Sequence, residues 1–253
     1  MPKILLDDIK QTKISALLYG PPNAGKTYLA GSALLVPELR PVFIMDCEGG
    51  LASIPHFIRG AGEEVILWSL QGNSDYQMLR SALFDESPIK TVIIDGLGEL
   101  YNFMMEQELA AAGREGGTPQ LQDYGKVRTR MSSLFRKART VAKRHLIVTC
   151  HDEIDKDETT GGMYISPALT GKLGKEISQF FSIQAYLTTE TKVRGGELTE
   201  KNYIAQIDGY GRVRAKFRSP EDLPGRLENT NMAEIYDMVI RPWQEESTSV
   251  FGN

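Results

Sequence analysis

The chain has few cysteines and no long apolar run, and both shortages limit what it can be. Its two cysteines, Cys47 and Cys150, each follow an apolar stretch, which favours buried reduced thiols over a disulfide framework. His151 adjoins Cys150, but no second ligand pair stands at zinc spacing, so we expect no zinc site. No apolar run reaches the roughly 18 residues that cross a membrane, and residues 1–13 are too short and too acidic for a signal peptide. We therefore expect a cytoplasmic protein with no membrane partner.

The composition is that of an ordinary globular protein, with 41% hydrophobic and 25% charged residues among 253. This content supports one substantial core. We expect one domain over residues 1–242 and a polar, disordered tail over residues 243–253. The net charge of −4 argues against indiscriminate binding to nucleic acid, although it does not exclude a local basic surface.

Short apolar runs alternate with longer amphipathic stretches up to residue 150. This alternation predicts an α/β fold with a mostly parallel sheet flanked by helices. The predicted strands are residues 14–19, 41–46, 65–69, 91–95 and 146–150. The predicted helices are residues 25–35, 75–84, 99–112 and 124–144.

The pattern changes after residue 150. A Gly/Thr-rich loop leads to a predicted helix over residues 173–181, and an amphipathic stretch near the end predicts another over residues 232–240. Between them lie three predicted strands, which we interpret as an antiparallel extension of the sheet. These strands are residues 183–188, 203–208 and 212–217.

The segment GPPNAGKT has the phosphate-loop pattern G-x-x-x-x-G-K-[ST], and it lies between an apolar strand and the start of a helix. Its glycines let the backbone wrap the phosphates of a nucleotide. Lys26 is expected to reach the β- and γ-phosphates, and Thr27 to offer a hydroxyl to Mg²⁺. The sequence therefore predicts an ATP and Mg²⁺ site. The nucleotide-binding residues of the loop are Gly20, Pro21, Pro22, Asn23, Ala24, Gly25, Lys26 and Thr27.

Acidic residues end two of the predicted strands. Asp95 closes the buried run TVIID, where a carboxylate would hold Mg²⁺ through water; the alternative is that Asp95 caps the next helix. A hydrolase also needs a group that orients the attacking water, and no acid directly follows Asp95. We favour Glu48, after the strand VFIMD, over Glu99 for this role; the alternative for Glu48 is a solvated acidic turn.

With these residues the chain resembles the RecA-like recombinase core, and among its members the phage-encoded ATPases that act as single-strand annealing proteins. The segment FIMDCE, which ends at Glu48, is similar to the family's strand with the catalytic glutamate, and Asp95 matches the magnesium aspartate. His151 stands where the family has a glutamine that senses the γ-phosphate; alternatively, it is a polar residue at a strand end. The resemblance covers about residues 14–218. It implies ATP, Mg²⁺, single-stranded DNA and a homo-oligomer, either a ring or a filament.

Two segments fall where this family places its DNA loops. The glycine-rich stretch 112–122 contains Arg114, and the long stretch 152–172 leads to Lys172 and Lys175. Glycine amides, threonine hydroxyls and lysines suit a sugar-phosphate backbone that is held without reading bases. The alternative is a surface lid unrelated to DNA.

Basic residues also gather on the predicted helix 124–144 and near residue 215. The helix carries a basic stripe without an acid after Asp123, which is either a solvated face or a surface for an anionic partner. Basic and apolar residues alternate over residues 212–218. From the resemblance, Arg214, Lys216 and Arg218 are candidates to enter the ATP site of a neighbouring subunit. The alternative is an edge strand protected by charge.

Together these features predict an ATP-hydrolysing, single-stranded DNA-binding protein that promotes annealing or recombination. If a phage encodes it, it acts in the cytoplasm of the bacterial host, where a single-stranded DNA-binding protein is a candidate partner. An AAA-type loader or remodeller is one rival, but it would normally show an acid after Asp95 and a helical lid after the core. The others are a small-molecule P-loop kinase and a nucleotide-gated binding protein with negligible turnover.

Overall fold

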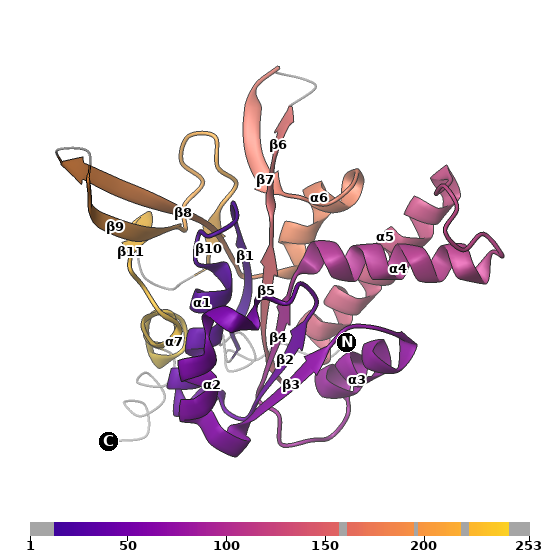
Figure 1. Cartoon of the computed structure of the whole chain (residues 1–253), viewed down its shortest axis with the longest axis horizontal. Helices are drawn as coiled ribbons and strands as arrows, with labels where there is room; N and C mark the ends of the chain where they lie inside the picture. The colour runs from indigo at the N-terminus through magenta and orange to yellow at the C-terminus, as the bar shows by residue number, and fades with distance from the viewer. Residues whose placement is uncertain (1–12, 157–160, 195–196, 219–222, 243–253) are drawn as a thin grey trace, which may run out of the picture.

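A computed structural model describes residues 13–156, 161–194, 197–218 and 223–242. The expected tail over residues 243–253 lies outside this part of the chain, as do residues 157–160 of the second predicted loop. One mixed sheet runs through the molecule in the order β11-β9-β8-β1-β5-β4-β2-β3, and helices cover both of its faces (Figure 1). The α/β class predicted from the sequence is confirmed. No helix among the described residues is both long and apolar enough to span a bilayer.

The parallel centre of the sheet follows the apolar runs of the sequence closely. Its strands are β1 (Ser15–Tyr19), β2 (Val42–Asp46), β3 (Val65–Ser69), β4 (Thr91–Asp95) and β5 (His145–Cys150). Nearly every residue of β1, β2, β4 and β5 is buried, because both faces of these strands are covered. β5 lies between β1 and β4. This order is that of a RecA-like P-loop core.

Alternate residues of each strand supply two separate cores. Phe43 and Met45 of β2 pack on the side of α3 (Asn73–Phe84), α4 (Leu97–Ala111) and α5 (Leu121–Thr140). Val42 and Ile44 pack on the opposite side. That side holds α1 (Lys26–Gly31) with its 3₁₀ continuation η2 (Ser32–Leu35), α2 (Pro55–Ala61) and α7 (Met232–Val239). The period of two along each strand thus divides the core between the two helical layers.

The sheet is extended beyond β1 as expected, with one difference. β8 (Ile183–Arg194) pairs parallel to β1, and the antiparallel part begins with β9 (Glu197–Gln206) and β11 (Arg226–Glu228). The strand predicted over residues 212–217 is reduced to β10 (Lys216–Phe217). The reason is that Val213 makes only an isolated bridge, while the carbonyl of Arg214 accepts hydrogen bonds from side chains of the core.

The segment 152–172, expected from the sequence to be a long Gly/Thr-rich loop, contains regular secondary structure. It holds the antiparallel strand pair β6 (Asp152–Lys156) and β7 (Met163–Pro167), which projects beyond the sheet in Figure 1. Ile154 faces Ile165 across this hairpin, and the Tyr164 hydroxyl donates to Asp155 at 2.6 Å. The short helix α6 (Lys172–Glu176) and the 3₁₀ turn η6 (Ile177–Phe180) follow. Cross-strand pairs, rather than local sequence, give this segment its structure.

The basic stripe of α5 is largely paired with groups from other elements, so it is not the unmatched face that the sequence indicated. Arg128 binds Glu176 through two hydrogen bonds, and Arg130 and Lys126 approach Glu108 at 2.9 and 3.6 Å. The helix ends at Thr140, before the predicted end at residue 144. Arg144 has left the helix and donates to backbone carbonyls in the segment 83–89.

His145 predicts a measurable dependence of stability on pH. Its Nδ1 accepts the amide N–H of Ile14 at 3.0 Å, and burial, aided by the charges of Lys13 and Lys90, lowers its pKa from 6.5 to about 4. Between these values the unfolded chain binds a proton that the folded chain does not. Folding stability from this residue is therefore present above pH 6.5 and is lost as the pH falls toward 4, by on the order of 3 kcal/mol.

The test is denaturant unfolding of wild type and His145→Asn across this pH range, since the asparagine oxygen can replace Nδ1 as the acceptor. We expect a shallower loss of unfolding free energy in the variant. Equal slopes for the two proteins would contradict the assignment.

Candidate nucleotide site

The phosphate loop joins the end of β1 to the start of α1, and its two glycines are required by close contacts. Gly20 has a φ of 155°, and a Cβ there would lie 2.1 Å from the carbonyl oxygen of Leu187. Gly25 has a φ of 85°, and a Cβ there would lie 2.9 Å from the ring of Tyr203. A side chain at either position would strain the backbone and displace a neighbour. The motif glycines thus fix the loop between β1 and the strands β8 and β9.

Lys26 is held by the loop itself. Its Nζ donates to the carbonyl oxygens of Gly20 and Pro21, each at 2.8 Å, and the residue is only 8% exposed. Burial lowers the pKa of Lys26, while nearby carboxylates, Glu48 first among them, oppose that shift. Lys26 lines an open cleft of about 820 Å³. This cleft is lined by the loop together with Glu48, His151, Lys201 and Tyr203.

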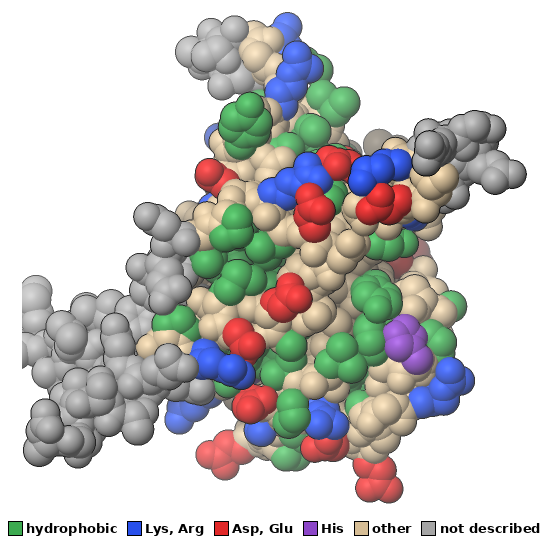
Figure 2. Space-filling model, turned by 90° about the vertical axis from the view of Figure 1, so that its left-hand side faces the viewer, with side chains coloured by type: hydrophobic (Ala, Val, Ile, Leu, Met, Phe, Trp, Pro, Cys, Tyr) green, Lys and Arg blue, Asp and Glu red, His purple; other side chains and the backbone are tan. Residues whose placement is uncertain are grey.

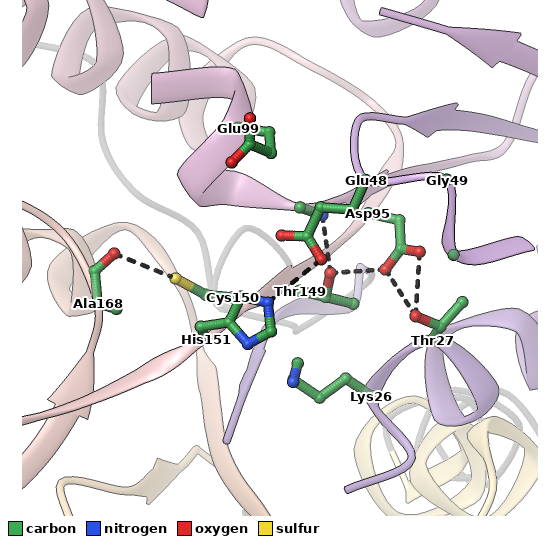
Figure 3. Close-up of polar contacts among 12 residues, drawn as sticks. Lys26, Thr27, Glu48, Gly49, Asp95, Glu99, Thr149, Cys150, His151 and Ala168 are labelled. Carbon is green, nitrogen blue, oxygen red and sulfur yellow. Dashed lines mark hydrogen bonds and ion pairs between the residues drawn. The ribbon is translucent and has the colours of Figure 1, made fainter. Parts of the chain in front are cut away.

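Thr27 and Asp95, both predicted as magnesium residues, are in direct contact (Figure 3). Thr27 lines the cleft, whereas Asp95 is not among the lining residues. The Thr27 hydroxyl lies 3.0 Å from both carboxylate oxygens of Asp95, and Thr149 Oγ1 donates to the same carboxylate at 2.6 Å. Asp95 is 2% exposed, so burial raises its pKa, against the two hydroxyl bonds that lower it. A hydroxyl and a carboxylate are the oxygen ligands that Mg²⁺ takes, and the pair therefore fits this ion.

Glu48 is presented to the cleft by a tight turn after β2. Asp46 Oδ1 accepts the backbone N–H groups of residues 48–50, with a shortest distance of 2.7 Å. The Glu48 carboxylate then lies 3.5 Å from His151 Nε2, and its side chain is 26% exposed. Burial raises the pKa of Glu48, and the nearby His151 partly offsets that shift. This turn brings Glu48 and His151 together from the ends of two separate strands.

The space for Glu48 exists because Gly96 follows Asp95. A Cβ on Gly96 would lie 2.5 Å from Glu48 Cγ, and the φ of 106° at Gly96 also disfavours a side chain. Glu99, the other candidate, lies on the first turn of α4 (Figure 3). Its carboxylate accepts a hydrogen bond from Asn102. The volume that an acid directly after Asp95 would use is thus taken by Glu48. The catalytic role of either glutamate stays a prediction.

The three basic residues predicted to act in trans do not line the cleft of their own chain. The Arg214 guanidinium lies 3.7 Å from the centre of the Tyr164 ring. Lys216 Nζ donates to the carbonyl of Ser178, and Arg218 is exposed. Their action on a neighbouring subunit stays a prediction.

The three residues predicted to bind DNA differ in whether their side chains are paired or exposed. Arg114 is bound to both oxygens of Asp123 at 2.8 Å, and Asp123 also accepts the N–H of Gln120 at the start of α5. Arg114 therefore holds the segment 114–123 together through its ion pair with Asp123, and in this conformation its role is structural. Lys172 and Lys175 are exposed.

Sequence reasoning missed several residues of the site. Thr149 lies within the predicted strand 146–150. Its polar hydroxyl in an otherwise apolar strand was a signal, but nothing in the sequence linked it to Asp95. Lys201 and Tyr203 belong to β9, far from any nucleotide motif, and only the fold of the hairpin brings them to the cleft. Gly96 carried the one usable signal, since a glycine at the end of a buried strand often marks a close approach.

A known protein family matches most of the chain. A family model described as an AAA domain covers residues 12–219. Among solved structures, the crystal structure of the RadB recombinase is 18% identical over 85% of this chain and 86% of its own, with a TM-score of 0.43. The assembled ATPase EscN of the enteropathogenic E. coli type III secretion system is 12% identical, with a TM-score of 0.44. That match covers 69% of this chain and 43% of EscN. No curated protein matches the sequence.

The family match and the geometry agree on the class of the protein. The phosphate loop follows β1, Thr27 at the start of α1 is hydrogen-bonded to Asp95 at the end of β4, and β5 lies between β1 and β4, as in a P-loop ATPase core. The family model spans well over half of the residues. The chain therefore belongs to the AAA domain family and is a P-loop ATPase with a RecA-like core.

Proposed function

We propose that this ATPase binds single-stranded DNA and promotes annealing or recombination, as phage-encoded RecA-like proteins do. One observation carries the proposal. The contact between Glu48 and His151 lies at the root of the β6–β7 hairpin, because Asp152 directly follows His151 and begins β6. A change at the nucleotide can therefore reach the hairpin through a single side chain.

The proposed chemistry assigns one task to each group of the cleft. Lys26 leaves its two loop carbonyls and pairs with the β- and γ-phosphates of ATP. Thr27 and, through water, Asp95 would hold Mg²⁺, which would neutralise charge on the phosphates. Glu48 orients the attacking water and accepts its proton, and His151 holds the Glu48 carboxylate and responds to its charge.

The hairpin is tied to the site at both of its ends. The carbonyl of His151 accepts the N–H of Ala168 at 2.8 Å, directly after β7. Ala168 in turn leads to the segment with Lys172 and Lys175, which we assign to the DNA backbone. A shift of His151 on hydrolysis would move these lysines as well, because the hairpin and the following turn share that hydrogen bond.

Assembly into a homo-oligomer, a ring or a filament, completes the proposal. Residues 1–242 act as one ATPase domain, and Arg214, Lys216 or Arg218 enters the ATP site of the next subunit. In the host cytoplasm, a single-stranded DNA-binding protein would supply or cover the substrate strand.

The rivals fit the described residues less well. An AAA-type loader shares the family, but Gly96 follows Asp95, and the described chain beyond β5 continues into strands and short helices rather than a helical lid. A small-molecule kinase would need arginines free to close on phosphates. Arg128 and Arg130 are instead bound to Glu176 and Glu108.

Lys26→Ala is expected to abolish ATP hydrolysis and to weaken nucleotide binding, because the ammonium neutralises phosphate charge in the ground state and in the transition state. The fold should survive. Phosphate release and equilibrium binding of ATP measure the two effects, and circular dichroism checks the fold. Normal turnover in a folded variant would remove the assignment of the phosphate loop.

Glu48→Gln is expected to retain Mg-ATP binding and to lose about a hundredfold or more in turnover, which is the scale of a positioned base. Glu99→Gln is the matched control and should change turnover little. Because the pKa of Glu48 is raised, the wild-type rate should fall with decreasing pH earlier than an ordinary glutamate would cause. This acid limb should be absent from the residual activity of Glu48→Gln. A large loss in Glu99→Gln with a small one in Glu48→Gln would reverse the assignment.

Single-stranded DNA is expected to stimulate ATP hydrolysis, and its binding should weaken steeply with salt, since phosphate contacts release counterions. Lys172→Ala/Lys175→Ala should reduce DNA affinity and leave the basal ATPase rate intact. Lys90→Ala/Lys143→Ala is the matched control, because it removes two exposed lysines that lie just before β4 and β5, at the opposite ends of these strands from Asp95 and His151. Equal hydrolysis rates with and without DNA, together with no gel shift at low salt, would contradict the proposal.

A further inference from the structure

A small apolar pocket lies directly beside the phosphate loop. It measures about 200 Å³, and half of its lining residues are aliphatic: Ala24, Leu29, Leu187, Ile204 and Ala205. It shares Ala24, Gly25, Tyr28 and Tyr203 with the larger cleft, so the two spaces are neighbours. Ligand pockets are usually about 300 Å³ or more, so this one fits one end of a ligand whose remainder lies in the cleft.

Tyr203 stands at the boundary between the two spaces. Its ring lies against Gly25, where an added Cβ would come within 2.9 Å of it, and 42% of the residue remains exposed. Lys201 Nζ lies 4.9 Å from the centre of the same ring and also lines the cleft. An aromatic face that is seated on the phosphate loop and still open to the cleft is suited to stack on a flat ring.

The main chain at Tyr203 is fixed, although its ring is open. Asn229 Oδ1 accepts the N–H of Tyr203 at 2.9 Å, and the N–H of Asn229 donates to the Tyr203 carbonyl at 2.7 Å. The Asn229 side chain also donates to Asn202, so its amide is already engaged. These bonds fix the main chain that carries the ring before any ligand arrives, which lowers the entropy cost of binding.

We infer that the nucleobase of the bound nucleotide enters this pocket and stacks on Tyr203, with Lys201 beside the ring. The inference rests on the proposed use of the cleft for ATP. The aliphatic lining recognises the flat face of the base, and the phosphates extend from it over Gly25 to Lys26. Figure 2 views the molecule from the side of the β8–β9 hairpin, where hydrophobic side chains lie open to solvent among charged ones.

Equilibrium binding without DNA tests the inference, with ATP and inorganic tripolyphosphate as the two probes. Tyr203→Ala should weaken ATP binding about tenfold, the effect of losing one stacking contact, and leave tripolyphosphate binding unchanged. Tyr203→Phe should bind ATP as wild type does. Tyr210→Ala is the matched control, because Tyr210 is 82% exposed and lies outside both spaces.

Two results would overturn the inference. Unchanged ATP affinity in Tyr203→Ala would show that the base lies elsewhere, and equal weakening of both probes would show that the ring only supports the phosphate loop. Photolabelling of the wild type with 8-azido-ATP needs no variant, and it should mark the peptide with Tyr203 or that with Tyr28 and Leu29. Labels confined to other peptides would also overturn it. Failure of Lys26→Ala to weaken either probe would instead refute phosphate binding at this loop, on which the proposed function depends.

Discussion

The nucleotide site depends on one buried carboxylate. Asp95 ends a strand at the centre of the sheet. Its carboxylate accepts hydrogen bonds from the hydroxyl groups of Thr27, on the helix after the phosphate loop, and Thr149, on the neighbouring strand. An ionised carboxylate in this position costs several kcal/mol unless it is paired with donors or a cation. The two threonines supply the donors, and a magnesium ion would supply the cation. Because the buried Asp95 carboxylate needs donors or a cation, the phosphate loop, the sheet and the expected metal come together at this residue.

Two glycines near this carboxylate are as important as its hydrogen-bond partners, because a side chain at either position would clash. Gly96 leaves the volume that Glu48 fills, and a Cβ on Gly50 would come within 2.8 Å of Asp95 Oδ2. Two carboxylates that follow separate strands therefore lie near each other, each with a raised pKa. Groups poised in this way are typical of catalytic sites, because a base with a raised pKa accepts a proton more readily.

Local patterns were enough to predict the parallel strands and the phosphate loop, because a buried strand needs a continuous apolar run and the loop is contiguous in sequence. Long-range contacts were not predictable in this way. Arg128 pairs with Glu176, which lies 48 positions away in the sequence. Because of such pairs, the basic stripe that looked unmatched in the sequence is largely paired in the structure. The β6–β7 hairpin depends on pairs across a turn, and Tyr203 reaches the phosphate loop only through the fold of β9.

The most direct test of this account is a crystal structure of the chain with magnesium and a non-hydrolysable ATP analogue. We expect Thr27 Oγ1 as a ligand of the metal, Asp95 within one water of it, and Glu48 facing a water in line with the γ-phosphate. A structure in which Glu48 points away from the γ-phosphate while Glu99 takes its place, or in which the metal lies apart from Asp95, would contradict it.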